Sequence, residues 1–411
     1  MKKKLLISVF SFCALSATSQ QWWPQNSQAQ NDFNTIYAAS SGTVYTYGDS
    51  SDIFGGFAYG SQFKTTSQGS DWNFLSMGSP VYLSKGSFFL STTVGYLAGE
   101  NAMSGNGFIL KTGNGGNTWV EGTPFPERFE DIKFINPNVG YACGRNDYVV
   151  RTNNAGATWV DVSANTGDHL MGVYFTTPAN GYVAGRAGNI AHTSDSANTW
   201  VNQTSNTPED LESIWFINDS TGWAVGKAGA IVYTNDWGLN WNIQTSNTPE
   251  DLFDVEFVND TMGWAVGTAG TVIKTIDAGV NWFIETSGTT EDIFSISMIN
   301  EQLGWFCGTN GVIYIYAMSP PPPPNSVGEI NQQLNVAVAP NPFDNKTVVY
   351  LPTTNSYVIT LTDINGRIIN SWQTTNTNQF DLSTAGMVPG IYLLNVIDEN
   401  NNSVTKRIIK N

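Results

Sequence analysis

A glycine–aromatic–x–x–glycine element recurs along most of the chain and constrains its fold more than any other feature. Successive copies begin at Gly95, Gly140, Gly181, Gly222, Gly263 and Gly304, so the first step is 45 residues and each later step is 41. A second element closes each unit with a tryptophan, at Trp72, Trp119, Trp159, Trp200, Trp241 and Trp282. A period near 41 residues, with short apolar segments between glycine turns, is typical of β-propeller blades of about four strands each.

One unit shows the expected strands clearly. Residues 210–217 predict an inner strand, called a here; residues 222–226 predict strand b and residues 230–234 predict strand c. A hairpin at residues 235–238 then leads to an outer strand d at residues 240–243. The fold class predicted for residues 20–318 is therefore an all-β propeller.

The two ends of the repeat region give the number of blades. Tyr45 and Gly48 form a degenerate copy of strand b, which brings the count to seven, but the last unit lacks its closing tryptophan. Trp22 lies 26 residues before Gly48, the same spacing that separates Trp200 from Gly226. We therefore expect residues 21–23 to supply the outer strand of the seventh blade and to close the ring.

The N-terminus predicts export. Lys2, Lys3 and Lys4 precede a mostly apolar stretch at residues 5–17, and Ala17 and Ser19 suit cleavage before residue 20. This pattern predicts a secretory signal peptide over residues 1–19, too short to span a membrane. The formal net charge of −16 disfavours binding to nucleic acid or to anionic membranes.

The C-terminal part differs in character. Five consecutive prolines lie within a predicted linker over residues 319–330, and no 41-residue repeat follows it. Residues 331–411 contain short alternating segments at 336–339, 347–351, 357–362, 367–372, 391–397 and 404–409, with an Asn365-Gly366 hairpin signal. The pattern predicts a small Ig-like β-sandwich.

This C-terminal part resembles the sorting domain of the Bacteroidota type IX (Por) secretion system. The resemblance rests on Ala339-Pro340-Asn341-Pro342-Phe343, on Asp363-Ile-Asn-Gly366-Arg367, on Gly390-Ile-Tyr-Leu-Leu394, and on the basic end with Lys406 and Arg407. It implies passage through the periplasm, recognition by the outer-membrane translocon and removal by a sortase-like peptidase. The product would be released or attached to surface lipopolysaccharide.

The propeller resembles the photosystem II assembly/stability factor family, whose blades carry Asp-box (BNR-type) hairpins. The segment from Gly222-Trp-Ala-Val-Gly226 to Trp241 carries the resemblance most clearly. It implies the fold; of the function it implies only a way of acting, namely binding protein through one propeller face. The hairpin residues Asp195, Asp236 and Asp277, with Asn114 and Asn154 in the same position, recur from blade to blade and are expected to hold the hairpins.

Cys143 and Cys307 occupy the same place in strand b, four blades apart. Equivalent positions in blades that are not neighbours are too far apart for a disulfide, which needs Cα atoms within about 7 Å. We expect both to be buried, unpaired core residues.

Charged residues are distributed unevenly over the face formed by the d→a and b→c connections. The position before strand a carries Asp32, Lys85, Arg128, His169, Asp210, Asp251 and Asp292 in blade order. The position after strand b carries Asp49, Glu100, Arg145, Arg186, Lys227, Thr268 and Thr309. The candidate ligand-binding residues are Arg128, Arg145, His169, Arg186 and Lys227, with Asp210, Asp251 and Asp292 in the neighbouring acidic arc. Arginine suits carboxylates and phosphates because its planar fork contacts two oxygens, whereas the alternative is a set of solvated loop charges.

The sequence favours binding over catalysis. It contains two histidines and no GxSxG, HExxH, P-loop or paired CxxC motif, so it predicts no catalytic residue, metal site or cofactor. The expected function is a secreted or cell-surface binding module for a protein or a glycan. The alternatives are a glycan-cleaving enzyme of the sialidase or xyloglucanase type, and a structural surface protein.

Overall fold

The computed structural model describes residues 20–27, 29, 31–50, 59–75, 77, 82–164, 166–319, 336–339, 343–344, 346–363, 368–383, 388–398 and 403–410. The chain divides into two compact units, Met1–Pro324 and Asn325–Asn411. The predicted signal peptide and all but the first residue of the predicted linker lie outside the described residues. Within the described residues, no helix has the length and apolar character needed to cross a membrane.

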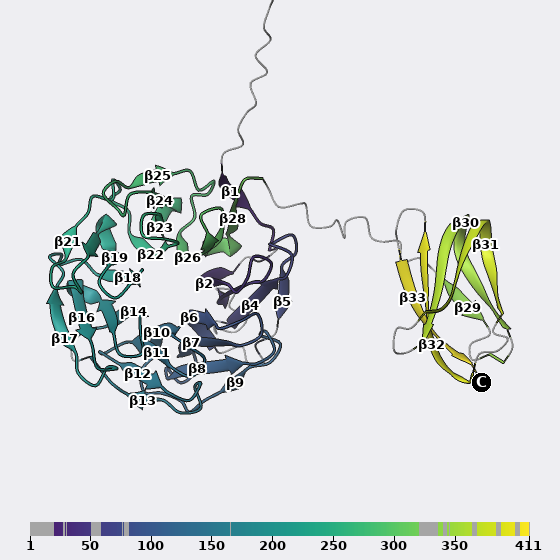
Figure 1. The fold of residues 1–411 in the computed structure, drawn as a ribbon, viewed down its shortest axis with the longest axis horizontal. Coiled ribbons are helices and arrows are strands. Elements are labelled where there is room, and N and C mark those ends of the chain that lie inside the picture. The colour runs from purple at the N-terminus through teal and green to yellow at the C-terminus, as the bar shows by residue number, and fades with distance from the viewer. Residues whose placement is uncertain are drawn as a thin grey trace, which may run out of the picture. The chain divides into compact units, whose positions relative to one another are not determined.

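The first unit is a ring of seven antiparallel four-stranded sheets, as Figure 1 shows. Blade 1 contains β2 (Asp32–Ala38), β3 (Val44–Ser50), β4 (Tyr59–Thr65) and β5 (Asn73–Leu75). Blade 2 contains β6 (Tyr82–Phe89), β7 (Gly95–Asn101), β8 (Gly107–Thr112) and β9 (Val120–Glu121). Blade 3 contains β10 (Phe129–Phe134), β11 (Gly140–Gly144), β12 (Val149–Thr152) and β13 (Val160–Asp161). Blade 4 contains β14 (Leu170–Phe175), β15 (Gly181–Gly185), β16 (Asn189–Thr193) and β17 (Val201–Thr204).

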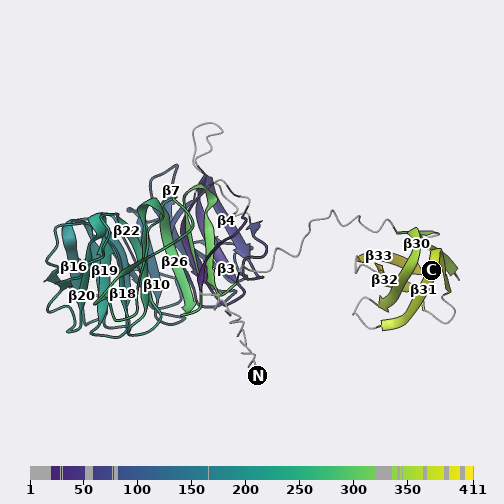
Figure 2. The ribbon, with the colours of Figure 1, turned by 90° about the horizontal axis from the view of Figure 1, so that it is seen from above.

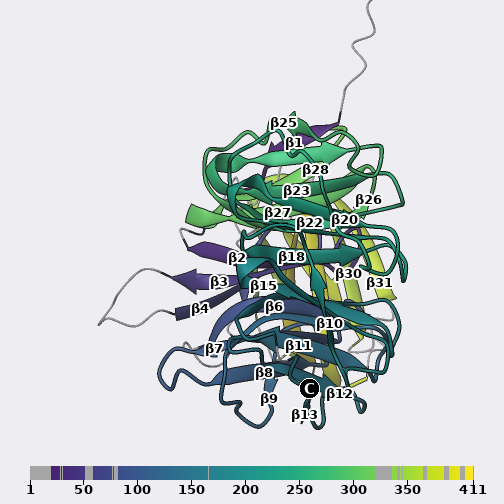
Figure 3. The ribbon, with the colours of Figure 1, turned by 90° about the vertical axis from the view of Figure 1, so that its left-hand side faces the viewer.

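The remaining blades continue the same order. Blade 5 contains β18 (Leu211–Phe216), β19 (Gly222–Gly226), β20 (Ile231–Thr234) and β21 (Asn242–Ile243). Blade 6 contains β22 (Leu252–Phe257), β23 (Gly263–Gly267), β24 (Val272–Thr275) and β25 (Phe283–Glu285). Blade 7 contains β26 (Ile293–Asn300), β27 (Leu303–Gly308), β28 (Ile313–Ala317) and the N-terminal β1 (Gln21–Pro24). Short 3₁₀ turns follow strand b in blades 4–7, at η1 (Arg186–Gly188), η2 (Lys227–Gly229), η3 (Thr268–Gly270) and η4 (Thr309–Gly311). In Figure 3 the first three strands of blade 1 are seen in succession.

The first and last segments of the propeller meet in blade 7. Strand β1 pairs antiparallel with β28, with Trp22 opposite Tyr316. The Trp22 ring packs 4.6 Å from Phe306 and 5.0 Å from Tyr316, measured between centroids, and its side chain is buried. This pairing covers the outer edge of β28, so the ring closes between residues almost 300 positions apart in sequence.

At each glycine of the repeated element a side chain would clash, and the clashing group differs between the two positions. A Cβ on Gly222 would lie 2.5 Å from the Phe216 ring, and a Cβ on Gly226 would lie 1.9 Å from the carbonyl oxygen of Asp210. The aromatic residue between them packs on the next blade: Trp223 stacks on Phe257 with ring centroids 3.7 Å apart. The motif therefore repeats because each blade must fit closely against itself and its neighbour.

The c–d hairpins are held by a buried threonine and a short acidic or amide side chain. In blade 5 the Asp236 carboxylate accepts bonds from the Asn240 backbone N–H and from the Thr234 hydroxyl, both at 2.9 Å. The Thr234 hydroxyl in turn accepts the Gly238 N–H at 2.9 Å. Blades 2, 3, 4 and 6 repeat the arrangement, which gives these side chains the predicted structural role.

The second unit is one bent five-stranded sheet around a single core, shown in Figure 2. Its strands are β29 (Ala337–Ala339), β30 (Lys346–Asp363), β31 (Ile368–Ser383), β32 (Gly390–Asp398) and β33 (Ser403–Lys410). The two strands expected at residues 347–351 and 357–362 are one long strand, β30, whose pairing register shifts between Tyr350 and Tyr357. The all-β fold class is confirmed: a propeller is followed by a small unit whose bent sheet surrounds its core and is compatible with the predicted sandwich.

Cys143 and Cys307 are both buried and free. Cys143 pairs across from Asp131 within its own blade, and Cys307 does the same with Ser295. The prediction of two separate core thiols is confirmed.

Candidate functional site

The aspartates that precede strand a are engaged in the scaffold. Asp210, Asp251 and Asp292 each accept a hydrogen bond, at 2.9 Å, from a backbone N–H in the turn after strand b of the preceding blade. The donors Ala187, Ala228 and Ala269 have φ of 52–53°, the left-handed region that alanine rarely adopts. These carboxylates therefore hold strained turns and tie each blade to the next.

Two of the predicted cationic residues are paired with carboxylates. Arg128 lies 2.5 Å from a Glu130 oxygen and 3.3 Å from a Glu100 oxygen. Lys227 lies 3.0 Å from Asp251 and 3.5 Å from Glu212. Burial lowers the pKa of Lys227, but the bond to Asp251 and the charge of Glu212 outweigh it and raise the pKa above its ordinary value.

Arg145 and Arg186 differ from these two residues. Among the residues that the structure describes, neither guanidinium has a carboxylate oxygen within 4.0 Å. The Nε of Arg145 is buried without a hydrogen-bond partner, and Arg186 is exposed. His169 lies between their turns, because its carbonyl accepts the Arg186 N–H at 3.0 Å and its Nδ1 accepts the Asn146 N–H at 3.2 Å. Blades 3 and 4 therefore bring Arg145, His169 and Arg186 to neighbouring turns on one face, called the arginine face below.

The assignment of Lys85 to the position before strand a is wrong. Ser84 pairs with Gly99, so Leu83 occupies that position and Lys85 falls two residues later. Lys85 instead lines the central channel, with its Nζ 4.0 Å from an Asp49 oxygen.

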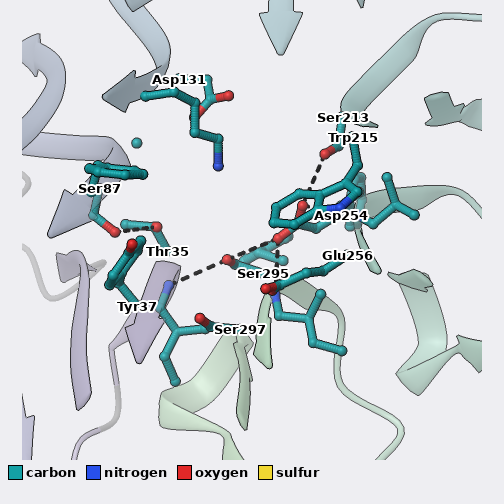
Figure 4. Close-up of a pocket in the computed structure, with 18 of the residues that line it drawn as sticks. Thr35, Tyr37, Ser87, Asp131, Ser213, Trp215, Asp254, Glu256, Ser295 and Ser297 are labelled. Atoms are coloured by element: carbon teal, nitrogen blue, oxygen red, sulfur yellow. Dashed lines mark hydrogen bonds between the residues drawn. The ribbon is translucent and has the colours of Figure 1, made fainter. Parts of the chain in front are cut away.

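The inner strands of the seven blades enclose a central cavity of about 360 Å³. Residues of all seven inner strands line it, three to five from each blade. Figure 4 shows Trp215, Asp254 and Glu256 on one wall and Thr35, Tyr37 and Ser87 on the opposite wall. The channel is therefore lined by aromatic, hydroxyl and charged groups together.

The channel carboxylates bond the inner strand of the next blade. Asp131 accepts the Val173 N–H at 3.1 Å, and Asp254 accepts the Ile296 N–H at 3.0 Å. Glu256 accepts the Met298 N–H at 3.0 Å through one oxygen. Asp254 also accepts the hydroxyls of Ser213 and Ser295, at 2.9 and 3.1 Å. These bonds link neighbouring inner strands, whose backbone groups do not pair with each other directly.

Burial affects the protonation of Glu256 and Asp254 in the channel. It raises the pKa of Glu256 to about 8, with the Asp254 charge adding to the effect and the Met298 N–H opposing it. Burial raises the pKa of Asp254 too, although Lys133 opposes this. At neutral pH Glu256 therefore holds its proton for much of the time.

Lys133 is a second cation of this lining, and unlike Lys85 it has no ion pair with a described residue. Burial alone lowers its pKa, but Asp131 and Asp254, with smaller contributions from Tyr37 and Glu256, raise it above the ordinary value. No carboxylate oxygen among the described residues lies within 4.0 Å of its Nζ, which sits 5.8 Å from the centre of the Trp215 ring. The ammonium is thus charged and enclosed, without an ion-pair contact to any described residue.

Sequence reasoning missed this channel cluster. Asp131 and Asp254 occupy an inner-strand position that holds Thr35, Gly86, Gly172, Ser213 and Ser295 in the other blades. Lys133 and Glu256 lie two residues later, where the other blades hold Tyr37, Phe88, Tyr174, Trp215 and Ser297, so no period marks the cluster. The signal that could have found them was the presence of charged residues at positions of strand a that face the inside of the ring. The part of the chain that the structure describes contains no group of three His, Cys, Asp or Glu side chains arranged to hold a metal ion.

The sorting-motif residues are placed in part. Gly390 begins β32 and lies opposite Lys410, while Lys406 and Arg407 of β33 lie opposite Leu394 and Leu393. Pro340, Asn341, Pro342 and Gly366 lie outside the described residues.

Two family comparisons agree with the predicted domains. Residues 337–411 match the family described as the secretion system C-terminal sorting domain. Residues 153–248 and 240–317 match the family described as the photosynthesis system II assembly factor YCF48. The predicted resemblance of each part is confirmed, and the chain is a secreted propeller that ends in a sorting domain.

Solved structures share the fold at low sequence identity. A structure of YCF48 bound to a D1 peptide is 16% identical with a TM-score of 0.58, covering 72% of this chain and 96% of that chain. YCF48 from Cyanidioschyzon merolae is 14% identical with a TM-score of 0.58, covering 72% and 99%. The GH74 enzyme of Niastella koreensis is 13% identical with a TM-score of 0.57, covering 92% of this chain and 72% of that chain. At such identities the similarity shows the fold alone, and no curated protein matches the sequence.

Proposed function

We propose that the chain is exported by a type IX secretion system and that its propeller binds a protein outside the cell through the arginine face. The observation that carries the proposal is the contrast between paired and unpaired cations on that face. Arg128 and Lys227 are neutralised by carboxylates of the chain, whereas Arg145 and Arg186 have none within 4.0 Å among the described residues. Unpaired guanidinium groups on a chain with a net charge of −16 are suited to a ligand that brings its own carboxylates.

The ligand chemistry that fits is an acidic peptide segment. Arg145 is partly exposed, and its guanidinium makes no hydrogen bond or ion pair with a described residue, so it can receive an incoming carboxylate. His169 lies between the two turns and adds a polar ring. A propeller of the same fold, YCF48, has been solved with a D1 peptide, which supports a peptide as the occupant of such a ring.

The test is capture from native cell envelopes and growth medium by the purified chain, beside an Arg145→Glu/Arg186→Glu variant. We expect the wild type to retain a protein that the variant loses, and we expect that capture to weaken with salt. Arg186→Glu and Lys346→Glu form a matched pair, because both residues are exposed and both changes alter the charge equally. Equal capture by all variants would reject the arginine face.

The second candidate is a glycan-cleaving enzyme. The observation that favours it is the set of channel carboxylates, Asp131, Asp254 and Glu256, in a fold shared with a GH74 enzyme. Glycoside hydrolysis requires two carboxyl groups, one of them protonated near neutral pH. This candidate predicts release of sugar that a single carboxylate change abolishes, with the arginine-face variants unaffected.

The export proposal also includes attachment to surface lipopolysaccharide after sorting. The lipid content of the processed chain tests this attachment.

A further inference from the structure

We infer that the central channel is a binding site for a neutral, hydroxyl-rich ligand such as a pyranose unit of a glycan. The site is separate from the arginine face and takes a different chemical class. The inference rests on a central cavity of about 360 Å³, on the Lys133 ammonium, which has no ion-pair contact with a described residue, and on hydrogen-bonding groups without partners beside aromatic rings. Cavities of this size hold small ligands.

The channel carboxylates differ in how many hydrogen bonds they can still accept. Asp254 accepts four bonds, from Ser213, Val255, Ser295 and Ile296, so its acceptor capacity is filled. Asp131 accepts one bond at each oxygen, which leaves acceptor capacity on both.

Glu256 and Lys133 leave further capacity open. Glu256 uses one oxygen for the Met298 N–H, and no contact within the described residues occupies the other. The three donors of the Lys133 ammonium also find no acceptor among them. The channel therefore offers both donors and acceptors, which a hydroxyl group satisfies in either role.

The second step is the charge of the channel. Three charged lining residues, Lys85, Glu130 and Glu212, are paired with Asp49, Arg128 and Lys227. Of the remaining charged groups, Lys133 carries one positive charge against Asp131, Asp254 and the partly protonated Glu256. Lys133, which lies beside the Trp215 ring, would repel a cationic ligand. The two or three ionised acids would repel an anionic ligand. A neutral ligand avoids both repulsions while using the same groups as hydrogen-bonding partners.

The third step is the aromatic lining. Trp215 and Tyr174 pack with ring centroids 5.0 Å apart on neighbouring blades, and Phe253 and Phe294 pack 5.4 Å apart on the next pair. All four line the cavity and remain partly accessible. Aromatic faces beside carboxylates and an ammonium suit the apolar C–H face and the hydroxyl edge of a sugar ring.

The experiment titrates the purified chain with the methyl glycosides of glucose, galactose, mannose and xylose, followed by saturation-transfer NMR and calorimetry. Acetate and methylammonium are the charged comparison probes. We expect at least one glycoside to bind, and we expect Lys133→Met to weaken it about tenfold or more through loss of charged hydrogen bonds. Lys346→Met, the same change at an exposed lysine of the second unit, is the control and leaves binding unchanged, as does Arg186→Glu on the arginine face.

Trp215→Phe provides a second variant if Lys133→Met does not fold, with Trp237→Phe, at an exposed tryptophan, as its control. Weaker glycoside binding in Trp215→Phe, with unchanged binding in Trp237→Phe, supports the channel site. The inference is overturned if no glycoside binds, if only acetate or methylammonium binds, or if the channel variants bind as tightly as the wild type. Failure here leaves the arginine face untouched, because the protein-capture experiment uses different variants and a different ligand.

Discussion

The carboxylate of Asp251 accepts a hydrogen bond from the backbone N–H of Ala228, 2.9 Å away on the preceding blade. Ala228 has a φ of 53°, and the adjacent Lys227 places its Nζ 3.0 Å from the same carboxylate. Burial opposes ionisation of Asp251, but the Ala228 N–H and the Lys227 ammonium outweigh it and lower the pKa of the carboxyl. One side chain thus holds a strained turn and joins two blades.

Replacing Asp251 with alanine should therefore lower stability without affecting ligand capture. We expect a loss of about 1–2 kcal/mol in the free energy of unfolding, because the N–H and the ammonium lose their acceptor. Denaturant unfolding measures the loss, with Asp251→Asn as the control that keeps an acceptor oxygen. Loss of protein capture at unchanged stability would place Asp251 in the ligand site instead.

Glu256 should make the stability of the propeller depend on pH. Burial raises the pKa of Glu256 to about 8 in the folded chain, whereas a glutamate in the unfolded chain titrates near 4.5. Between these values the folded state holds one more proton, so the free energy of unfolding falls as pH rises, by at most about 1.4 kcal/mol per pH unit.

Glu256→Gln removes this titration and keeps an oxygen for the Met298 N–H. The stability of the variant relative to the wild type should therefore increase from about pH 5 to about pH 8 and level off above that. Unfolding measured across this range checks the difference between the two proteins. Parallel curves for both would show that Glu256 titrates normally.

The buried hydroxyl of Thr234 should be essential to its hairpin. Thr234→Val keeps the shape but leaves the Gly238 N–H without its acceptor, so we expect a loss of about 1–3 kcal/mol in the free energy of unfolding. The corresponding Thr275→Val change in blade 6 should cost a similar amount, since its hydroxyl accepts the Gly279 N–H at 2.8 Å. A neutral effect at both sites would mean that water replaces the hydroxyl.

The ring closure should depend on Trp22. Trp22→Ala removes a side chain that is 5% exposed and packed on Phe306 and Tyr316, so we expect a loss of about 3–5 kcal/mol in the free energy of unfolding. Trp237→Ala is the control, because this tryptophan is 53% exposed. Equal losses in the two variants, measured by denaturant unfolding, would contradict the closure role.

The parts of the fold that the sequence predicts are those in which one steric demand recurs in every blade. Gly222 and Gly226 face a phenyl ring and a carbonyl oxygen, and the same demands return 41 residues later at Gly263 and Gly267. Periodicity thus identifies strands b, c and d in blade 5 to within two residues. The cationic residues of the arginine face were also visible, although their pairing depends on side-chain geometry that no spacing encodes.

The channel cluster could not be predicted in the same way. Lys133 and Glu256 come from blades 3 and 6, and only the closure of the ring brings them into one cavity. The spacing in blade 2 is also irregular, so its register could not be predicted from the repeat. The prediction therefore assigned Lys85 to the position that Leu83 occupies, two residues earlier. In the second unit, β30 continues through Pro352, in the stretch where its pairing register with β31 shifts between Tyr350 and Tyr357.

The pairing of β1 with β28 also determines how the propeller responds to changes in length. An open array of repeats can lose one member and keep the geometry of the others, because each contacts only its neighbours. In this ring the seven blades share one full turn, and the first strand must meet the last. Deleting a single 41-residue unit would widen every angle from a seventh to a sixth of a turn, so the number of repeats behaves as a property of the whole ring.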